Sequence, residues 1–556
     1  MKVRIWPLAV ALALIFCACQ QTEKAEKVFI NGHIWTGNSL QPWATCMGIK
    51  GDRILFVGDK YRAWCNAATS IIDLQKKLVT PGFIDNHVHF LSGGFQLASV
   101  DLRSAVTPKE FTSRLADFAK QLPEGRWISG GDWDHEAWGG ELPRREWIDS
   151  VSNNHPVFIS RLDGHMALAN TAALRLAGID RNTADPAGGT IVRDPTTGEP
   201  TGILKDEAMS LVFGVMPNLS NDELDEAVDR AIAHALSLGV TQVHDVSSMG
   251  GWTDLETYKR AYATNRLKLR IYSFVPIADW QRMAEYVRNN GRGDNMLRWG
   301  ALKGFVDGSL GSTTAWFYKP YDDAPNTTGL LVTDSTALRK WIVDADAAGL
   351  QIGVHAIGDH ANDWLLGVFA EAVRANGTRD RRFRIEHAQH LTAEAIPKFA
   401  AQGVIPSMQP YHAIDDGRWA EKRIGKKRCK TTYAFNSLLK AGAQLTFGSD
   451  WTVAPINPLE GIYAAVTRQT LDGKNPKGWY PEEKITVAQA LECYTSHNAF
   501  AGFQEKDLGT LEAGKLADFV VLSANIFEIP QQDIRNVKVL RTVVGGVDRY
   551  SDLGSD

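Results

Sequence analysis

The amino-acid sequence predicts an α/β protein: a TIM-type (β/α)8 barrel with an insertion after its first strand, plus a small β-sandwich domain built from both termini. Two observations predict this fold. Between residues 81 and 502, apolar β-rich runs alternate with helical patterns, as the units of a parallel barrel do. In residues 27–80 and 503–556, short β-rich runs occur without intervening helical patterns, which is typical of antiparallel sheets.

The expected β-sandwich domain is divided between the two ends of the chain. Its first part, residues 27–80, has an Asn31-Gly32 turn and a Gly58-Asp59 turn between apolar runs. Its second part, residues 503–556, has strand-like runs at 517–522 and 537–544. Neither part has enough strands to be stable alone. We therefore expect the two parts to form one domain beside the barrel.

The expected barrel has one strand in each of eight apolar runs, at residues 83–87, 240–244, 269–274, 302–306, 351–355, 383–387, 404–408 and 444–448. The chain between the first two runs is far longer than a helical crossover. We therefore expect an inserted subdomain at about residues 95–235, covering the barrel mouth.

The first eighteen residues predict a signal peptide. Lys2 and Arg4 precede an apolar stretch, residues 5–18, which is short for a membrane span. The stretch ends in Phe16-Cys17-Ala18-Cys19, which resembles a bacterial lipobox. We expect lipidation at Cys19, a linker over residues 19–26, and a periplasmic protein attached to the outer membrane only through this lipid. A freely secreted product and an uncleaved anchor are the alternatives.

The composition is that of a globular protein, with 44% apolar and 22% charged residues in 556. The formal net charge is only −4, and no run of Lys and Arg dominates a segment, so nucleic-acid binding is disfavoured. The expected partner is a small molecule. The sequence leaves open whether the protein is a homo-oligomer.

Four cysteines follow the signal region: Cys46, Cys65, Cys429 and Cys493. Export permits disulfides, and Cys46 with Cys65 is then the expected pair, but ordinary buried thiols explain these residues equally well. None lies in a CxxC or Cys/His arrangement, so a cysteine zinc site is not indicated.

The most informative stretch ends the first barrel strand. His87 and His89 alternate there, so both imidazoles project to the same side, as ligands of a divalent metal would. His355, His387 and Asp450 each end another apolar run. Alone, each of these histidines is more often a satisfied buried imidazole than a ligand, and the aspartate can be read as a helix cap. Together they lie at the strand ends where barrel enzymes place catalytic groups.

Lys303 is unusual because its apolar run would bury the amine. Burial of an unpaired ammonium is costly and lowers its pKa toward the neutral form. A neutral lysine can take up carbon dioxide, and the resulting carbamate can bridge two cations. A salt bridge to Asp307 or another carboxylate is the alternative.

With these residues in place, the sequence resembles the amidohydrolase superfamily, in the family 3 branch that includes N-substituted formamide deformylases. The family pattern of HxH, Lys, His, His and Asp matches His87, His89, Lys303, His355, His387 and Asp450. Flanking segments also match: 163–165, 307–311, 386–389, 409–412, 448–450 and the tail 509–518. Trp451 departs from the family, where smaller or different residues follow the aspartate, so the shape of the pocket is open.

The resemblance implies two divalent metal ions, zinc first, with manganese, iron or cobalt as alternatives. His87 and His89 would hold one ion and His355 and His387 the other. N6-carboxylated Lys303 would bridge them, and Asp450 would ligate the first ion and be the catalytic acid–base. Asp163, His165 and His412 are the expected substrate contacts. The implied reaction is hydrolysis of a non-peptide C–N bond, in an amide, formamide or cyclic amide, by a metal-activated hydroxide.

Three other functions remain open at this point. The same centre could hydrolyse a lactone or a phosphoester, which the ligands do not distinguish. A deaminase would not need Lys303. A non-catalytic envelope lipoprotein would have little use for all six metal-site residues.

Overall fold

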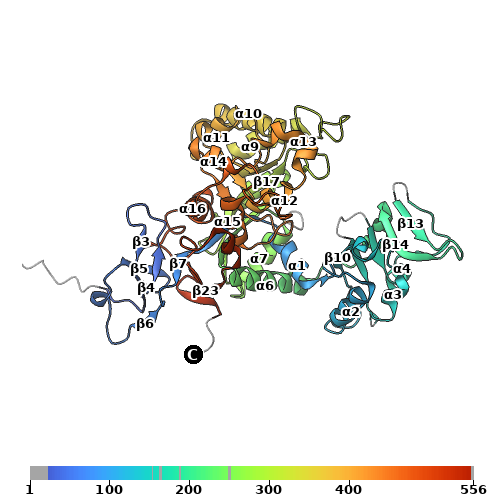
Figure 1. The fold of residues 1–556 in the computed structure, drawn as a ribbon, viewed down its shortest axis with the longest axis horizontal. Coiled ribbons are helices and arrows are strands. Elements are labelled where there is room, and N and C mark those ends of the chain that lie inside the picture. The colour runs from blue at the N-terminus through green and yellow to red at the C-terminus, as the bar shows by residue number, and fades with distance from the viewer. Residues whose placement is uncertain (1–22, 153, 162–165, 187–188, 248–251, 553–556) are drawn as a thin grey trace, which may run out of the picture.

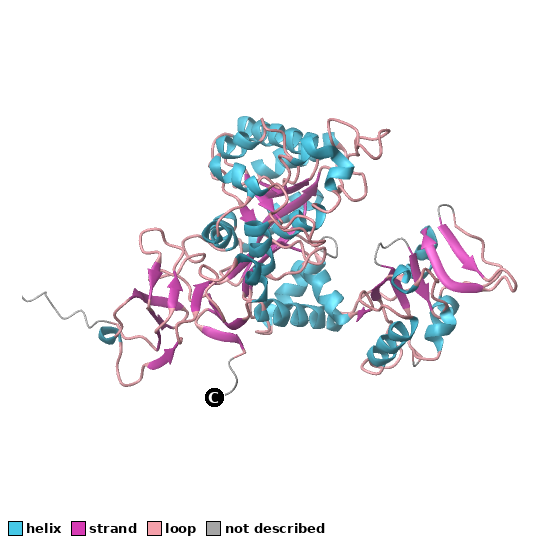
Figure 2. Ribbon diagram, in the orientation of Figure 1, coloured by secondary structure: helices cyan, strands magenta, loops and turns pink. Residues whose placement is uncertain are grey.

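The computed structural model describes residues 23–552, except for 153, 162–165, 187–188 and 248–251. A β-domain, a barrel with its helices, and an insertion follow one another across the molecule (Figures 1 and 2). The expected signal peptide and Cys19 lie outside the described residues. Within the described part of the chain, no helix is both long enough and apolar enough to cross a membrane.

The β-domain consists of two sheets. The first has the strand order β5-β4-β1-β6, with β1 (Lys27–Ile30), β4 (Cys46–Lys50), β5 (Arg53–Gly58) and β6 (Ser70–Asp73). The second has the order β24-β23-β22-β7-β2-β3, with β2 (His33–Trp35), β3 (Trp43–Ala44), β7 (Leu78–Pro81), β22 (Phe519–Leu522), β23 (Val539–Val544) and β24 (Val547–Ser551).

The two ends of the chain meet inside the second sheet. Strand β7 pairs antiparallel with β22, in the register Leu78 to Leu522 and Pro81 to Phe519. One apolar core lies between the sheets and draws Phe29 and Met47 from the beginning of the chain and Phe519 from its end. The prediction of a small sheet domain made by both termini is confirmed.

The barrel has eight parallel strands in sequential order: β8 (Phe83–Val88), β15 (Val240–Asp245), β16 (Arg270–Pro276), β17 (Leu297–Phe305), β18 (Gln351–Ala356), β19 (Arg384–His387), β20 (Ile405–Met408) and β21 (Thr446–Phe447). These are the eight predicted runs. Strand β17 begins earlier than predicted, because Arg298 and Gly300, which has a positive φ of 102°, interrupt the apolar pattern at its start.

The barrel closes between its first and last strands. Val88 and Trp451 form a parallel bridge just beyond β21. The side-chain amide of Asn86 donates to Thr446 Oγ1 over 2.6 Å across the same seam. The result is a nearly closed, TIM-like barrel, as predicted.

Helices cover the barrel: α1 (Phe90–Ala98), α6 (Asn221–Ser237), α7 (Thr253–Ala263), α8 (Trp280–Asn290), α9 (Ser335–Ala347), α10 (Asp359–Asn376), α11 (Ile396–Gln402), α12 (Pro410–Asp416), α13 (Ala420–Cys429), α14 (Phe435–Lys440), α15 (Pro458–Thr467), α16 (Val487–Tyr494) and α17 (Ser496–Ala501). Helix α6 begins at a capping box of Ser220 and Glu223, and its buried side chains face the barrel core.

The insertion has its own mixed sheet, in the order β13-β14-β12-β11-β10-β9. Its elements are β9 (Val100–Asp101), α2 (Pro108–Ala119), β10 (Gly130–Trp133), α3 (Arg145–Asp149), β11 (Phe158–Arg161), β12 (Met166–Ala169), α4 (Thr171–Leu176), β13 (Gly189–Arg193), β14 (Pro200–Asp206) and α5 (Ser210–Phe213). Phe111, Trp133 and Ile159 lie in a core that belongs to the insertion alone.

The insertion does not lie across the barrel mouth, which corrects one expectation. It extends to one side, beyond α1 and α6 (Figure 1). These two helices connect it to the barrel and pack so closely that a Cβ on Gly94 would come within 2.0 Å of the Ala227 carbonyl oxygen. Because the insertion fills its own core, it needs no contact with the barrel mouth to be stable.

The four described cysteines are free thiols in the structure. Cys46 is buried and donates to the Gly58 carbonyl oxygen over 3.0 Å. The structure therefore has unpaired thiols at Cys46 and Cys65, and not the disulfide that export would permit.

Candidate metal centre

The six predicted metal-site residues converge at the mouth of the barrel. His87 lies in β8, Lys303 in β17, His355 in β18 and His387 at the end of β19. His89 directly follows β8, and Asp450 lies three residues beyond the end of β21. His87 Nε2 lies 3.4 Å from Lys303 Nζ and 3.5 Å from Asp450 Oδ1. His89 Nε2 lies 3.3 Å from the same carboxylate oxygen. The rings of His355 and His387 have their centroids 4.4 Å apart.

Three of these residues form the tightest group. Ligand atoms of His87, His387 and Asp450 all lie within 4.8 Å of one another, and all three residues are buried. Imidazole nitrogens and a carboxylate are the ligands that zinc and related divalent metals accept in proteins. The donor set therefore fits a divalent metal.

The backbone at two of the predicted ligands is strained. His387 has a φ of 73° and Asp450 a φ of 59°, in the left-handed region that side chains other than glycine rarely adopt. The Ser449 amide, next to Asp450, donates to Asp85 Oδ1 over 3.0 Å, which fixes the turn. Such strain persists where the surroundings determine the conformation and is common at functional sites.

Each of the four imidazoles has one nitrogen in a hydrogen bond to an oxygen. His89 Nδ1 lies 2.8 Å from the Ser247 carbonyl and His355 Nε2 lies 3.1 Å from the Gly308 carbonyl. His387 Nδ1 lies 2.8 Å from Gln409 Oε1, and His87 Nδ1 lies 2.6 Å from Glu386 Oε2.

These oxygens fix the tautomers, because a carbonyl oxygen accepts hydrogen bonds and cannot donate one. The bonded nitrogen must then carry the proton, which leaves a lone pair on the other nitrogen. His355 therefore offers Nδ1, and the other three histidines offer Nε2. Burial favours the neutral forms of His87, His355 and His387, and it lowers the pKa of His87 to about 4 and that of His355 to about 3. Burial also disfavours a charged His89, but its contact with the Asp450 carboxylate raises the pKa of His89 above its ordinary value.

Lys303 is buried against this group. Burial lowers the pKa of its amine to about 8. The alternative salt bridge to Asp307 is not formed. That carboxylate accepts instead from the backbone amides of Trp316, Ile357 and Gly358, over 2.7 to 3.0 Å. Among the residues that the structure describes, Lys303 has no ion-pair partner within 4.0 Å, so its amine faces the histidines.

Asp450 is ionised in this environment. Burial raises its pKa, but the hydrogen bond with His89 and the neighbouring imidazoles hold the pKa of the carboxyl well below its ordinary value. Oδ1 faces His87 and His89, whereas Oδ2 lies 3.9 Å from His412 Nε2. One oxygen is therefore directed toward the metal ligands and the other toward the open side of the centre.

One predicted substrate contact lies beside the centre. The His412 ring, on α12, lies parallel to that of His387, and its buried Nε2 has no hydrogen-bond partner in the described part of the chain. Asp163 and His165, the other two predicted contacts, lie outside the described residues.

A cavity of about 500 Å³ opens in front of the predicted metal ligands. Its other walls were not predicted from the sequence: Phe305, Leu310, Ile357, Trp419 and Val453 are apolar, and Asp415 and Asp416 are acidic. All of its described lining residues come from the barrel and its loops. Trp419 lies in an irregular segment between α12 and α13, and no sequence pattern marks it as a lining residue.

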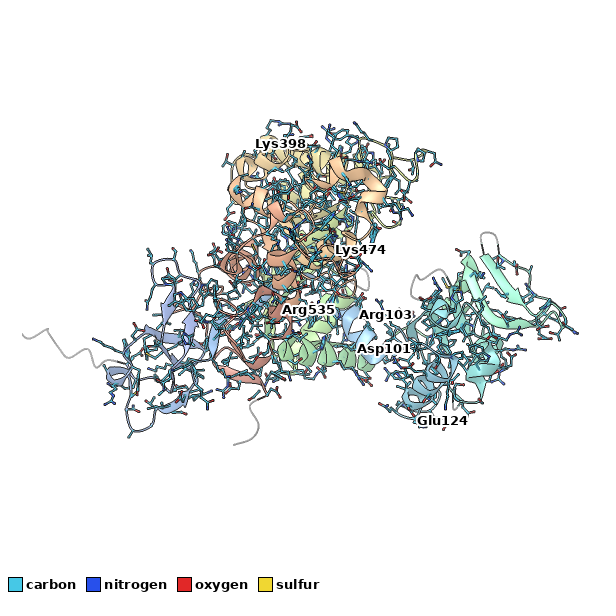
Figure 3. The ribbon with its side chains drawn as sticks, viewed as in Figure 1. Asp101, Arg103, Glu124, Lys398, Lys474 and Arg535 are labelled. Atoms are coloured by element: carbon cyan, nitrogen blue, oxygen red, sulfur yellow. The ribbon has the colours of Figure 1, made fainter. Side chains whose placement is uncertain are left out.

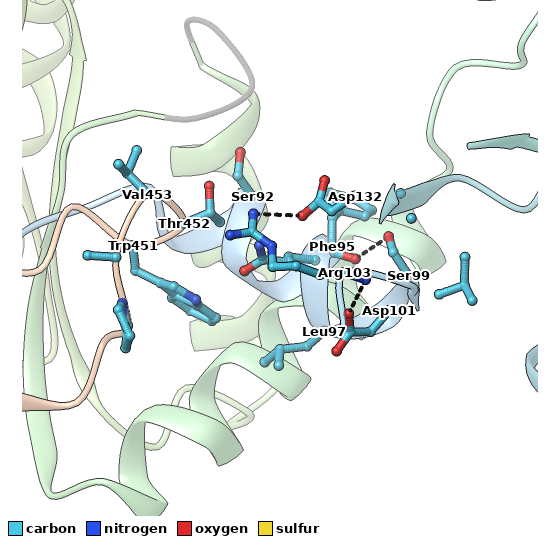
Figure 4. Close-up of a pocket in the computed structure, with 16 residues that line it drawn as sticks. Ser92, Phe95, Leu97, Ser99, Asp101, Arg103, Asp132, Trp451, Thr452 and Val453 are labelled. Carbon is cyan, nitrogen blue, oxygen red and sulfur yellow. Dashed lines mark hydrogen bonds and ion pairs between the residues drawn. The ribbon is translucent and has the colours of Figure 1, made fainter. Parts of the chain in front are cut away.

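A second cavity, of about 700 Å³, lies between the barrel and the base of the insertion (Figure 4). Arg103 and Asp132 form an ion pair of 3.1 Å on its wall, and Figure 3 shows Arg103 and Asp101 at this junction. Val453 lines both cavities. Trp451, whose effect on the pocket the sequence left open, lines only this second cavity.

Known proteins resemble this chain over most of its length. A model of the Amidohydrolase family matches residues 70–550. The Arabidopsis thaliana protein LONG AFTER FAR-RED 3 is 43% identical over 540 residues, covering 95% of this chain and 92% of that protein. N-substituted formamide deformylase of Arthrobacter pascens is 29% identical over 554 residues, covering 96% and 100%. An uncharacterized metal-dependent hydrolase from Pyrococcus furiosus has a crystal structure that superposes with a TM-score of 0.76 at 31% identity, covering 90% of this chain and 100% of that chain.

Proposed function

The chain belongs to the amidohydrolase family, and from this premise we propose that it hydrolyses a non-peptide C–N bond in an amide, formamide or cyclic amide. It has the fold of a metal-dependent hydrolase. The observation that carries the proposal is the buried group of His87, His387 and Asp450, with ligand atoms within 4.8 Å of one another.

The proposed cofactors are two divalent ions, zinc first, with manganese, iron or cobalt as alternatives. His87, His89 and Asp450 would hold one ion, and His355 and His387 the other, with N6-carboxylated Lys303 between them. Ions at such a site lower the pKa of water and polarise a carbonyl group. The lone pairs on His87 and His89 Nε2 and on His355 Nδ1 support this assignment.

Asp450 is the proposed general base and acid. Its ionised carboxylate accepts a proton from the attacking water and returns it to the leaving nitrogen, because an amine leaves poorly unless it is protonated. Oδ2, on the open side, is placed for this exchange. His412 Nε2 is proposed to bind the substrate, since it is buried, unpartnered and within 3.9 Å of Asp450. Asp163 and His165 stay proposed substrate contacts.

The walls of the cavity support a neutral substrate with an apolar substituent. Phe305, Leu310 and Trp419 give it an apolar side, and Asp415 and Asp416 disfavour an anion. Lys303 is the one lysine or arginine among the described lining residues, and carboxylation would remove its positive charge. The name of the Arthrobacter relative, a deformylase of N-substituted formamides, agrees with this class.

Export is also proposed. Residues 1–18 have the pattern of a signal peptide and Cys19 that of a lipidated residue, which would hold the protein at the periplasmic face of the outer membrane.

A hydrolysis screen tests the proposal. The mature protein, reconstituted with zinc or manganese, would be offered N-formyl, N-acyl and cyclic imide compounds, with lactones and phosphoesters in parallel. We expect release of amine from at least one C–N substrate. Hydrolysis of lactones or phosphoesters alone, or no bound metal after reconstitution, would contradict it.

A further inference from the structure

Glu386 has a fully buried side chain between two metal-site residues. It precedes His387 in β19, yet its carboxylate contacts the histidine of a different strand. Glu386 Oε2 lies 2.6 Å from His87 Nδ1, and both side chains are 0% exposed.

Other side chains hold this carboxylate in place. Arg384 Nε donates to Glu386 Oε1 over 2.7 Å, and the Ser407 hydroxyl donates to Oε2 over 2.6 Å. Arg384 is itself 0% exposed and donates to His244 Nδ1 over 3.0 Å. Both carboxylate oxygens of Glu386 therefore accept hydrogen bonds from fixed donors. In its contact with Glu386, His87 Nδ1 is then the donor and the carboxylate the acceptor.

An ion pair at this depth is weak evidence for stability. Removing two charges from water is costly, and a well-packed apolar pair of similar volume is often at least as stable. The buried pair of Arg384 and Glu386 therefore calls for another explanation, and its contact with His87 supplies one.

His87 differs from the other three histidines in its partner. Neutral oxygens of Ser247, Gly308 and Gln409 accept from the other imidazoles, whereas His87 donates to a carboxylate. A carboxylate behind an imidazole orients the ring and makes its free nitrogen a stronger donor to a metal.

We propose that Glu386 is a positioning residue that fixes the proton of His87 on Nδ1 and makes the metal position of His87 the tighter of the two. Arg384 and Ser407 hold Glu386 in the orientation this requires. The inference rests on the metal centre of the proposed function, but it concerns metal affinity and not the reaction.

The test compares the full mature protein with Glu386→Gln, which keeps the volume and removes the charge. Zinc binding would be measured by competition with a chromogenic chelator. We expect the tighter zinc affinity to fall by about 10- to 100-fold in the variant, the range found for such outer partners. Glu386→Asp, which keeps the charge, is expected to recover part of this loss.

Glu483→Gln is a matched control. Glu483 is also a buried carboxylate, and it accepts from the Ser437 amide over 2.9 Å, but it does not line the metal-site cavity. This variant is expected to lower thermal stability without changing zinc affinity. A loss of affinity that is equal in both variants would show a general effect of lost folding and would overturn the proposal.

A measurement on the unaltered protein keeps the proposal testable if Glu386→Gln does not fold. Nitrogen-15 NMR of the histidine side chains, assigned with His87→Gln, should show His87 protonated on Nδ1 with and without zinc. Protonation on Nε2 in the metal-free protein would overturn the inference.

The two proposals can fail independently. If the protein binds zinc and hydrolyses amides but Glu386→Gln binds zinc equally well, only the inference about Glu386 fails. If zinc affinity falls but no amide is cleaved, the proposed function fails alone.

Discussion

The backbone amide of Asp450 donates to the backbone carbonyl oxygen of His87 over 2.7 Å. This bond joins a ligand after the last barrel strand to a ligand in the first. The contact between the first and last barrel strands therefore lies at the candidate metal centre. A substitution that disturbs this contact is expected to disturb the centre as well.

Gly448→Ala tests this relationship. A Cβ at Gly448 would lie 2.6 Å from the His87 backbone nitrogen and 2.8 Å from Asn86 Oδ1, and backbone cannot move away cheaply. We expect a loss of about 2–4 kcal/mol in the free energy of unfolding, together with loss of activity. Gly367→Ala, in the interior of α10 with nothing within 4 Å, is the control and should be neutral or stabilising. Denaturant unfolding of both variants measures the difference, and equal stabilities would contradict the prediction.

Asp450→Asn should separate metal binding from catalysis. The amide oxygen can still contact a metal, but the side chain no longer accepts a proton. We expect bound metal to be retained while kcat falls by about 10²- to 10⁴-fold, the usual contribution of general acid–base catalysis. Elemental analysis and kinetics on the same sample measure both quantities. Activity within tenfold of the unaltered protein would assign the proton transfer to another group.

Lys303→Arg should abolish the carbamate. Burial lowers the pKa of Lys303 to about 8, so the neutral amine that takes up carbon dioxide is well populated near that pH. The protein incubated with ¹³C-bicarbonate and metal is expected to show a carbamate carbonyl signal by NMR, and the variant none. Bound metal should fall from about two ions per chain to about one or fewer. A carbamate signal in the variant would place the modification elsewhere.

Trp419→Ala should reduce activity selectively. The indole lines the apolar side of the cavity, and contact with a side chain of this size is worth about 1.5–3 kcal/mol. We expect kcat/KM to fall by about 10- to 100-fold for amides with a large apolar substituent and little for small formamides. Trp43→Ala, in the β-domain, should affect neither. An equal loss for large and small substrates would show damage to the metal centre instead.

The buried ring of His390 is expected to cause part of the pH dependence of the free energy of unfolding. Its ring is buried, with Nδ1 2.8 Å from Thr432 Oγ1 and Nε2 3.1 Å from Gln389 Nε2, an amide that can only donate. Burial lowers the pKa of His390 to about 3, well below the ordinary value of about 6.5 for histidine. The unfolded chain therefore binds the proton more readily, and stability should fall as pH drops from about 6.5 toward about 3, by up to about 1.4 kcal/mol per unit. His390→Asn should reduce this slope in denaturant unfolding at several pH values; an unchanged slope would contradict the assignment.

The sequence predicted the barrel well because its strands are apolar β-rich runs that alternate with helical patterns. Strand β17 was predicted too short because Arg298 and Gly300 interrupt its pattern, although the strand continues through them. The direction of the insertion was predicted wrongly. Its place in the chain shows where it leaves the barrel but not which way it turns beyond α1 and α6.

The predicted ligands could be brought together from the sequence because strand ends meet at one mouth of a parallel barrel. The groups that accept hydrogen bonds from these histidines could not be predicted from the sequence. Gly308 and Ser247 act through backbone carbonyls, which leave no trace in residue type, and Gln409 and Glu386 reach histidines of other strands. Trp419 enters the cavity from a loop whose path depends on the folded structure.

The pairing of β7 with β22 has a consequence for synthesis of the chain. Leu78 and its neighbours emerge from the ribosome early, but the strand they pair with is translated near the end. The second sheet of the β-domain must therefore remain incomplete during most of translation, and a prematurely stopped chain would leave the edge of β7 uncovered. The β-domain is therefore among the last parts of the molecule that can finish folding, because β22 and the strands after it cannot dock until nearly the whole chain has been made.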